Sequence, residues 1–341
     1  MPDAFLSLSS EVLPEFREYE RASTTTVNAY VGPKMQEYLN GLEKRLIQNN
    51  VKTSPHIIHS NGGMLTVKTA AKLPVRTCLS GPAAGVVGAA SISSSAGYPN
   101  ILAFDVGGTS TDVSLVLDGQ PLFTSERNVA GYPVKSPAID VTAIGAGGGS
   151  IAWIDDGGAL KVGPHSAGAS PGPVAYGLGG KNITLTDANL ILGRLNPNTP
   201  LAGNISLDVE TAYIEMENQI ANPLNISVEA AATGIIKVAS SGIARAIRGV
   251  AAAKGNSPSE FTLFAYGGAG PLCAADVNEE VGCPKIIIPP APGTLCARGI
   301  LLSDLSFDFV RSLLILADKR AWDTVCLLYT SDAADEGLGV D

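Results

Sequence analysis

The stretch FDVGGTSTDV, residues 104–113, determines how the rest of the chain is interpreted. The apolar run 101–104 leads into it and alternating apolar residues over 113–117 follow it, which predicts a strand, a tight turn and a second strand. Gly107 and Gly108 permit positive backbone angles and a close approach, so the N–H groups of the turn can converge on an anion. The pattern predicts a hairpin whose turn binds anionic oxygens. The alternative is a plain β-hairpin with acidic turn residues.

Two carboxylates flank this turn, because Asp105 precedes the glycines and Asp112 follows them. Carboxylates beside a phosphate would repel it unless a cation such as Mg²⁺ bridged them, directly or through water. Thr109 and Thr111 add hydroxyl groups to the same segment. These residues predict a phosphate site with Asp105 and Asp112 as its metal ligands.

Composition indicates a globular protein with an extensive core. The 341 residues can hold two or three lobes, and 45% are hydrophobic while only 16% are charged. The formal net charge of −9 argues against a nucleic-acid surface, and no uninterrupted apolar run reaches the length of a membrane span. Five cysteines without a CxxC pair, and no basic-then-apolar leader at Met1, predict reduced thiols. We therefore expect a cytoplasmic protein that binds neither nucleic acid nor membrane.

Two further glycine-rich loops follow predicted strands. Residues 145–150 (GAGGGS) follow the predicted strand 139–144, and we favour a ligand-facing loop over a simple hairpin because such flexibility is costly to order. Residues 266–271 (YGGAGP) lie between a predicted strand, 261–266, and a helix that starts near Leu272. Strand, glycine loop and helix can place a nucleotide at a helix N-terminus, although GGAGP alone is a weak signal.

The remaining elements alternate between strands and helices, which predicts an α/β sheet. Capping and periodicity predict the following: a helix over 24–48 capped by Ser23, a strand at 57–58 and a helix starting near 80; a third strand at 122–124 and irregular structure over 162–176; a helix from Thr186-Asp187 to about Gly193 and a polar connection over 196–225; a helix over 228–254 capped by Ser227, a strand at 285–288 and a helix over 294–302.

Taken together, these segments resemble the hydantoinase A/oxoprolinase family. The likeness is carried, in family order from about residue 9 to 310, by SSEVLPEFREYERASTT (9–25), SNGG (60–63), LSGPAAGVVGAA (79–90), FDVGGTSTDVSLV (104–116), GAGGGSIAW (145–153), VGPHSAGASPGP (162–173), TDANLILGRL (186–195) and YGGAGP (266–271). The resemblance implies an actin/Hsp70/sugar-kinase-like ATPase fold, with ribonuclease H-like lobes that close on ATP and Mg²⁺.

The family motifs also assign roles to individual residues. By resemblance, Asp105 and Asp112 are catalytic and bind the metal, and the second phosphate loop also includes Gly107, Gly108, Thr109 and Thr111. Gly267, Gly268 and Gly270 match the loop that contacts adenosine. The chain departs from the usual family pattern at His165, Ser170 and Cys273, which leaves details of substrate and nucleotide contact open.

The resemblance implies an ATP-dependent hydrolase that opens a cyclic amide, such as 5-oxoproline, a hydantoin or an N-methylhydantoin, by phosphorylating the amide oxygen. A subunit of an ATP-dependent ketone carboxylase and a non-catalytic nucleotide-binding fragment are the alternatives. The implied partners are a small-molecule cyclic amide and a hydantoinase B-type subunit or domain, in an oligomer.

The family pattern further implies that the chain is an incomplete ATPase. Its first phosphate hairpin, a DxGGT motif near the true N-terminus, has no match here, so we expect a fragment that is inactive alone. We expect residues 1–22 to be the remnant of an N-terminal lobe and 23–310 to be the ATPase-like domain. Residues 311–341 would be a truncated end, of which 321–341 continue no earlier pattern and look non-native.

Overall fold

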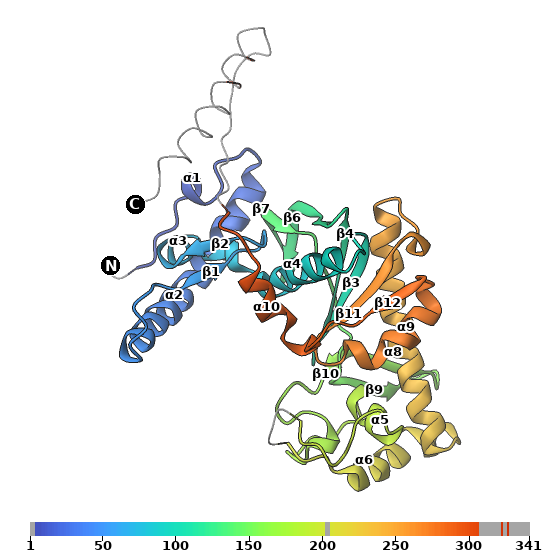
Figure 1. Ribbon diagram of the computed structural model, residues 1–341. Helices are drawn as coiled ribbons and strands as arrows, with labels where there is room; N and C mark the ends of the chain where they lie inside the picture. The colour runs from blue at the N-terminus through green and yellow to red at the C-terminus, as the bar shows by residue number, and fades with distance from the viewer. Residues whose placement is uncertain (1–3, 202–204, 307–321, 323–325, 327–341) are drawn as a thin grey trace.

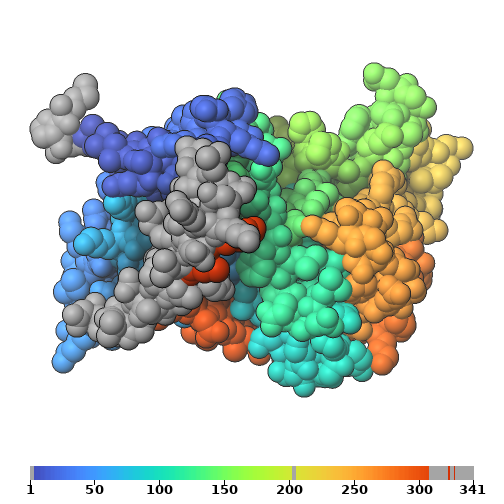
Figure 2. All heavy atoms as spheres, turned by 90° about the horizontal axis from the view of Figure 1, so that it is seen from above, coloured from blue at the N-terminus to red at the C-terminus, as the bar shows by residue number. Residues whose placement is uncertain are grey.

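A computed structural model of the chain describes residues 4–201, 205–306, 322 and 326. A central sheet separates two outer groups of elements (Figure 1). The long helix α2 (Glu18–Gln48) lies at one end of the molecule, and the small sheet of β9 (Ser150–Ile154) and β10 (Leu160–Ser166) lies at the other. Figure 2 shows the same division from above, with the blue N-terminal residues at one end and the yellow-green to orange residues at the other.

The central sheet has six strands. Its order is β12 (Lys285–Ile287), β11 (Thr262–Tyr266), β3 (Ile101–Val106), β4 (Thr111–Leu117) and β5 (Gln120–Pro121), with β8 (Thr142–Ile144) also paired to β4. Neighbours from β3 to β5 are antiparallel, whereas β11 is parallel to β3 and β12 to β11. The sheet is therefore mixed, with three antiparallel strands followed by two parallel ones. The α/β prediction is therefore confirmed.

Helices cover both faces of this sheet, which is why β3 and β11 are apolar apart from Asp105 and Thr262. On one face, Leu102, Phe104 and Val106 pack with α8 (Val228–Ala253) and α9 (Gly270–Val281). On the other face, Ile101 and Ala103 pack with α4 (Ser80–Ser95) and α10 (Leu295–Leu301).

Helix α8 belongs to two cores. Its C-terminal half, with Ile243 and Ile247, packs on the central sheet, while its N-terminal half packs on β9, β10 and α5 (Leu185–Ile191). Ser227 caps α8 by accepting a hydrogen bond from the backbone of Ala230 at 3.2 Å, as predicted. One continuous helix therefore joins the central sheet to the subdomain that contains β9 and β10.

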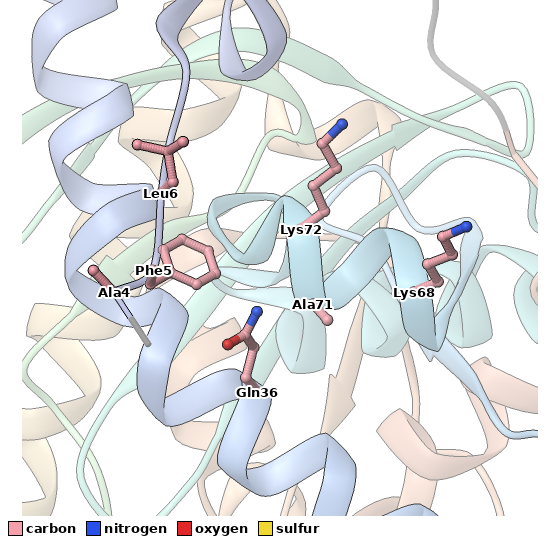
Figure 3. A pocket seen from close by; sticks show the side chains of 7 residues that line it. All are labelled: Ala4, Phe5, Leu6, Gln36, Lys68, Ala71 and Lys72. Atoms are coloured by element: carbon pink, nitrogen blue, oxygen red, sulfur yellow. The ribbon is translucent and has the colours of Figure 1, made fainter. Parts of the chain in front are cut away.

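The N-terminal region is built on α2. It also contains α1 (Ser9–Val12), β1 (His56–Ile58), β2 (Met64–Thr66), α3 (Val67–Lys72) and the hairpin of β6 (Phe123–Val129) and β7 (Tyr132–Ile139). A hollow of about 630 Å³ lies between the first described residues, α2 and α3, with Phe5, Gln36, Lys68 and Lys72 on its walls (Figure 3). Phe5 packs on α2 at Gly32, and Lys72 pairs with Glu11 at 3.0 Å. We attribute this hollow to the packing of the N-terminal segment.

Several expected boundaries are wrong. Helix α2 begins at Glu18, so Ser23 lies inside it, because the polar run before Ser23 continues the helix without a breaker. The predicted third strand, 122–124, is the start of β6, which extends to Val129 and pairs with β7 outside the central sheet, while β5 was not expected. The predicted strand 139–144 is the end of β7 and, separately, β8.

Three further corrections concern the subdomain that contains β9 and β10. Residues 160–166 form β10 despite Pro164, because β10 pairs with β9 alone and its register shifts between Val162 and Ser166. The cap of α5 is Thr184, which forms a capping box with Asp187. The polar connection 196–225 contains α6 (Val209–Met216), capped by Asp208. The expected non-native segment 321–341 falls outside the described residues, apart from 322 and 326.

Within the described ranges, no single helix has the length and hydropathy needed to cross a bilayer. The segments Val209–Leu224 and Val228–Ala253 pass that test only together, across an 83° bend.

Candidate functional site

The hairpin predicted at residues 104–113 is present. Strands β3 and β4 pair in antiparallel register, with Asp105 opposite Asp112, and the Gly107 N–H closes the turn by donating to the Ser110 carbonyl at 3.0 Å. Gly107 and Gly108 do not have the positive φ that the sequence led us to expect. A Cβ added at Gly107 would meet only the Ser110 carbonyl oxygen, at 3.7 Å, and one at Gly108 would have no neighbour within 4 Å. Neither backbone conformation nor internal packing requires these two glycines.

The loop 145–149 lies directly on this turn. The N–H groups of Gly148 and Gly149 donate to the carbonyls of Gly107 and Gly108 at 2.9 and 2.7 Å. A Cβ added at Gly147 would lie 2.8 Å from the backbone of Thr109. The glycines of this loop are therefore needed for close packing against the turn.

A pocket of about 450 Å³ opens beside the turn. Its lining combines glycines with apolar side chains. The lining consists of Gly107, Gly108, Thr109, Gly148, Gly149, Gly168, Ala169, Pro173, Tyr176, Thr186, Leu195, Leu201, Ile205, Gly268, Ala269 and Leu272. The pocket therefore joins three segments that are far apart in the sequence: the hairpin turn, the subdomain of β9 and β10, and the start of α9.

The loop after β11 completes the pocket. Gly268 lines it, and a Cβ added there would have no neighbour within 4 Å. Gly267 is different, because its φ is +85° and an added Cβ would lie 2.1 Å from Asp105 Oδ1. The Ala269 N–H donates to the Val106 carbonyl at 2.9 Å, which attaches the start of α9 to the end of β3. Gly267 therefore serves packing, whereas Gly268 leaves space open.

The two carboxylates form a cross-strand pair on one face of the sheet. Burial raises the pKa of Asp105, and a hydrogen bond from the Cys296 thiol at 3.4 Å opposes that rise. Burial, followed by the charge of Asp105, raises the pKa of Asp112 to about 6. Neither carboxylate is among the residues that line the pocket. The pair lies beneath the turn, toward α4 and α10, on the face where Cys296 and Gly85 also lie.

This pair is suited to a hard divalent cation. Mg²⁺ is usually bound by one or two carboxylates and keeps several waters, and two partly buried carboxylates that repel each other provide such a donor set. Over the described part of the chain, no cluster of three or more His, Cys, Asp or Glu side chains has a metal-binding arrangement. The fit is therefore to a largely hydrated ion rather than to a cage of protein ligands.

The predicted site residues take up different positions. Gly107, Gly108, Thr109 and Gly268 line the pocket, whereas Gly267, in the loop before α9, and Gly270, the first residue of α9, are not among its lining residues. The Thr111 side chain is buried and its hydroxyl donates to the Ala146 carbonyl at 2.5 Å, so it holds the glycine loop in place.

Tyr176, Thr186, Leu195 and Leu272 also line the pocket, and none of them was among the predicted site residues. The TDANLILGRL motif is the one signal that pointed toward part of this set. Arg194, at the end of that motif, makes a two-pronged ion pair with Asp276 on α9, at 2.6 and 2.9 Å. This pair fixes the wall that carries Leu195 against the helix that carries Leu272.

The sequence also matches the family model described as Hydantoinase/oxoprolinase over residues 21–309. The chain belongs to this family. Subunit alpha of the Pseudomonas jessenii caprolactamase is 39% identical over 95% of the chain and 46% of its own length. The 5-oxoprolinase of Saccharomyces cerevisiae is 38% identical over 88% of the chain and 24% of its own length.

Solved structures agree with this assignment. The crystal structure of the ATP-dependent caprolactamase from Pseudomonas jessenii superposes with a TM-score of 0.81 at 35% identity, covering 98% of this chain and 49% of that one. The nucleotide-free structure of acetone carboxylase gives a TM-score of 0.80 at 32% identity, covering 87% and 42%. The hydantoinase/oxoprolinase chain described here thus spans about half, or less, of the length of these relatives.

Proposed function

We propose that the pocket binds ATP and that the chain is the nucleotide-binding part of an ATP-dependent enzyme that hydrolyses cyclic amides. The observation that carries this proposal is the set Gly107, Gly108 and Gly268. All three lack a positive φ, and a Cβ added to any of them would meet no atom closer than 3.7 Å, yet all three line one pocket. Glycines that neither backbone conformation nor packing requires are expected where a ligand approaches the backbone closely.

Two parts of the pocket lining, which we call its phosphate end and its base end, fit the two parts of ATP. The turn at Gly108 and Thr109 would hold the phosphates, because backbone N–H groups and the hydroxyl of Thr109 are donors for anionic oxygens. Tyr176, Leu195, Leu201, Ile205 and Leu272 would enclose the base. Gly267 and Gly270 would shape the loop beside the adenosine.

The chemistry follows from the stability of the amide. A lactam or hydantoin carbonyl resists water, and phosphorylation of its oxygen gives the carbon a good leaving group. We assign Asp105 and Asp112 the role of holding Mg²⁺, directly or through water; when bound, that ion supplies positive charge next to the transferred phosphoryl group. The hairpin backbone would orient the phosphates, and the half-buried site would limit the access of water.

Several features of the whole protein belong to the same proposal. Caprolactamase subunit alpha is named as a subunit, which supports a second, B-type subunit or domain for this protein and an oligomer. We also propose that residues 23–310 are the ATPase-like domain of a longer polypeptide, whose other phosphate hairpin completes the clamp. This would make the 341 residues inactive alone. The short polar segment 1–22 would then be the end of the preceding lobe, and the protein would act in the cytoplasm.

A second candidate is an ATP-dependent carboxylase subunit, favoured by the TM-score of 0.80 with acetone carboxylase. In that case ATP would activate bicarbonate or an enolate, and the same pocket would bind the ATP.

The test compares Asp112→Asn with the unchanged protein, each within the complete polypeptide. ATP hydrolysis is followed with 5-oxoproline, with a hydantoin, and with a ketone plus bicarbonate. We expect stimulation by a cyclic amide and a loss of at least about 100-fold in Asp112→Asn. Asp118→Asn, on the exposed turn after β4, is the matched control and should retain full activity. Unchanged turnover in Asp112→Asn would overturn the assignment, and stimulation only by ketone plus bicarbonate would favour the carboxylase.

A further inference from the structure

Two adjacent residues at the start of α5, Thr186 and Asp187, hold different segments of the pocket wall. Asp187 is buried and is not among the lining residues, whereas Thr186 lines the pocket and its side chain also interacts with the hydroxyl of Tyr176. Thr186 uses both its backbone N–H and its hydroxyl to donate to one acceptor, the Gly148 carbonyl, each at 2.8 Å. Gly148 in turn donates to the Gly107 carbonyl at 2.9 Å. Thr186 is therefore connected to the hairpin turn through a single intervening residue.

Asp187 fixes another segment of the wall. Its carboxylate is fully buried and accepts hydrogen bonds from the N–H of Ala175 at 2.8 Å and from the N–H and hydroxyl of Thr184 at 2.8 and 2.7 Å. The bond to Ala175 holds the turn Val174–Tyr176, and Tyr176 lines the base end of the pocket. A buried carboxylate whose recorded partners are N–H and O–H donors is a rigid connection, because losing any one donor leaves a charge poorly solvated.

We propose that Thr186 and Asp187 are positioning residues of the nucleotide site, with Thr186 setting the phosphate end and Asp187 setting the base end. The inference rests on the proposed function, since it takes the pocket ligand to be ATP. Because both residues belong to the first turn of α5, a displacement of that turn moves both ends of the pocket together. Rigid coupling of this kind would keep the distance between the two ends matched to one ligand, a purine nucleotide with its phosphates extended.

The test separates the two ends with ATP and adenosine, each titrated by calorimetry into the complete polypeptide. Thr186→Val removes the hydroxyl and keeps the backbone bond and the side-chain shape. It should weaken ATP binding about 5-fold, the loss expected for one hydrogen bond, and weaken adenosine binding by a smaller factor, because Thr186 also touches Tyr176. Thr233→Val is the matched control, because Thr233 is exposed on α8 and its hydroxyl donates to the Glu229 carbonyl far along the sequence from the pocket segments. It should change neither affinity.

The second arm addresses the base end. Tyr176→Leu alters the wall without disturbing the buried carboxylate, and Asp187→Asn replaces one acceptor oxygen by a donor group. Each of these substitutions should weaken the binding of ATP and of adenosine by the same factor, so the ratio of the two affinities stays constant. An equal loss of ATP and adenosine binding in Thr186→Val would overturn the division of roles, and so would unchanged affinities.

The connection between Thr186 and the glycine loop can also be tested by a measurement made without nucleotide. Amide hydrogen exchange at Gly148 and Gly149 should become at least about 5-fold faster in Thr186→Val, while the exchange of β11 stays unchanged. Unchanged exchange at these glycines would refute the positioning role of Thr186. Faster exchange together with no binding of ATP to the unchanged chain would uphold the coupling and contradict the proposed function instead.

Discussion

Among single residues, Gly267 fixes the relation between the carboxylate pair and the loop after β11. Its φ is +85°, and a Cβ would lie 2.1 Å from Asp105 Oδ1. Gly267→Ala should therefore lower the free energy of unfolding by at least about 2 kcal/mol, because both the backbone angle and the clash are unfavourable. Chemical denaturation followed by circular dichroism measures the change.

Gly268→Ala is the matched control for that substitution. It lacks the positive φ and has open space around the added methyl group, so the free energy of unfolding should change by less than about 0.5 kcal/mol. The methyl group would nevertheless project into the proposed site and weaken the binding of ATP. A large loss of stability in Gly268→Ala, or none in Gly267→Ala, would contradict the distinction between a packing glycine and a ligand-facing glycine.

His59 should make the fold sensitive to acid. It is fully buried, the backbone N–H of Asn61 donates to its Nδ1 at 2.8 Å, and burial, followed by the charges of Arg76 and Arg127, lowers its pKa to about 3. The unfolded chain takes up this proton near pH 6.5 and the folded chain does not, so stability falls as pH decreases between these values.

From pH 7.5 to 5.5 this residue alone should remove about 1.4 kcal/mol from the free energy of unfolding. His59→Asn retains an acceptor near the position of Nδ1 and should lose that part of the pH dependence. His56 is exposed, so His56→Asn is the control and should keep the pH dependence of the unchanged chain. If the free energy of unfolding changed equally with pH in the unchanged chain and in His59→Asn, this explanation would be ruled out.

The residues that local sequence could identify are those whose partners are close along the chain. A two-strand hairpin places Asp105 opposite Asp112 by its register alone, and that pairing is present. Thr186 reaches Gly148 only because the subdomain of β9 and β10 folds back onto the hairpin, and no local pattern encodes that contact. The backbone angles of Gly107 and Gly108 could not be predicted either, because glycine adopts positive and negative φ about equally well.

At the level of elements, the crossing of α4 and α10 depends on one glycine. A Cβ added at Gly299 would lie 1.8 Å from the Ala84 carbonyl oxygen and 3.1 Å from the Gly88 nitrogen. Gly299→Ala should therefore separate the two helices and destabilise the fold by about 3 kcal/mol. The thermal midpoint should fall accordingly.

The control for this prediction lies on α8. Gly249 is exposed within a continuous helix and a Cβ there would meet nothing within 4 Å, so Gly249→Ala should stabilise the fold by up to about 1 kcal/mol. Opposite signs for two Gly→Ala changes in helices are the expected outcome. A neutral or stabilising effect of Gly299→Ala would show that α4 and α10 do not cross as described.

Elements with clear caps or strong apolar patterns were predictable, and those shaped by tertiary pairing were not. The Ser227 cap and the buried stripe of α8 followed from the sequence. Helix α2 began earlier than expected, because a plausible cap at Ser23 does not interrupt a helix that the preceding charged residues support. Only the start of β6 was predicted, since its full length and its place outside the central sheet depend on its pairing with β7.

At the scale of the whole molecule, the pocket exists only because three distant segments meet. The motif resemblance implied a nucleotide cleft, and the central sheet agrees with the expected α/β fold. The position of the carboxylate pair outside the pocket lining, and the apolar wall of Tyr176 and Leu195, could not be predicted from local sequence. Both depend on how α8 joins the two cores and on the ion pair between Arg194 and Asp276.

The most direct test of the proposed nucleotide pocket is amide hydrogen exchange of the chain with and without ATP and Mg²⁺. The account predicts slower exchange in three segments together, residues 106–111, 145–149 and 267–272, and no change over α2. Protection confined to other parts of the chain, or no protection at saturating ATP, would contradict it.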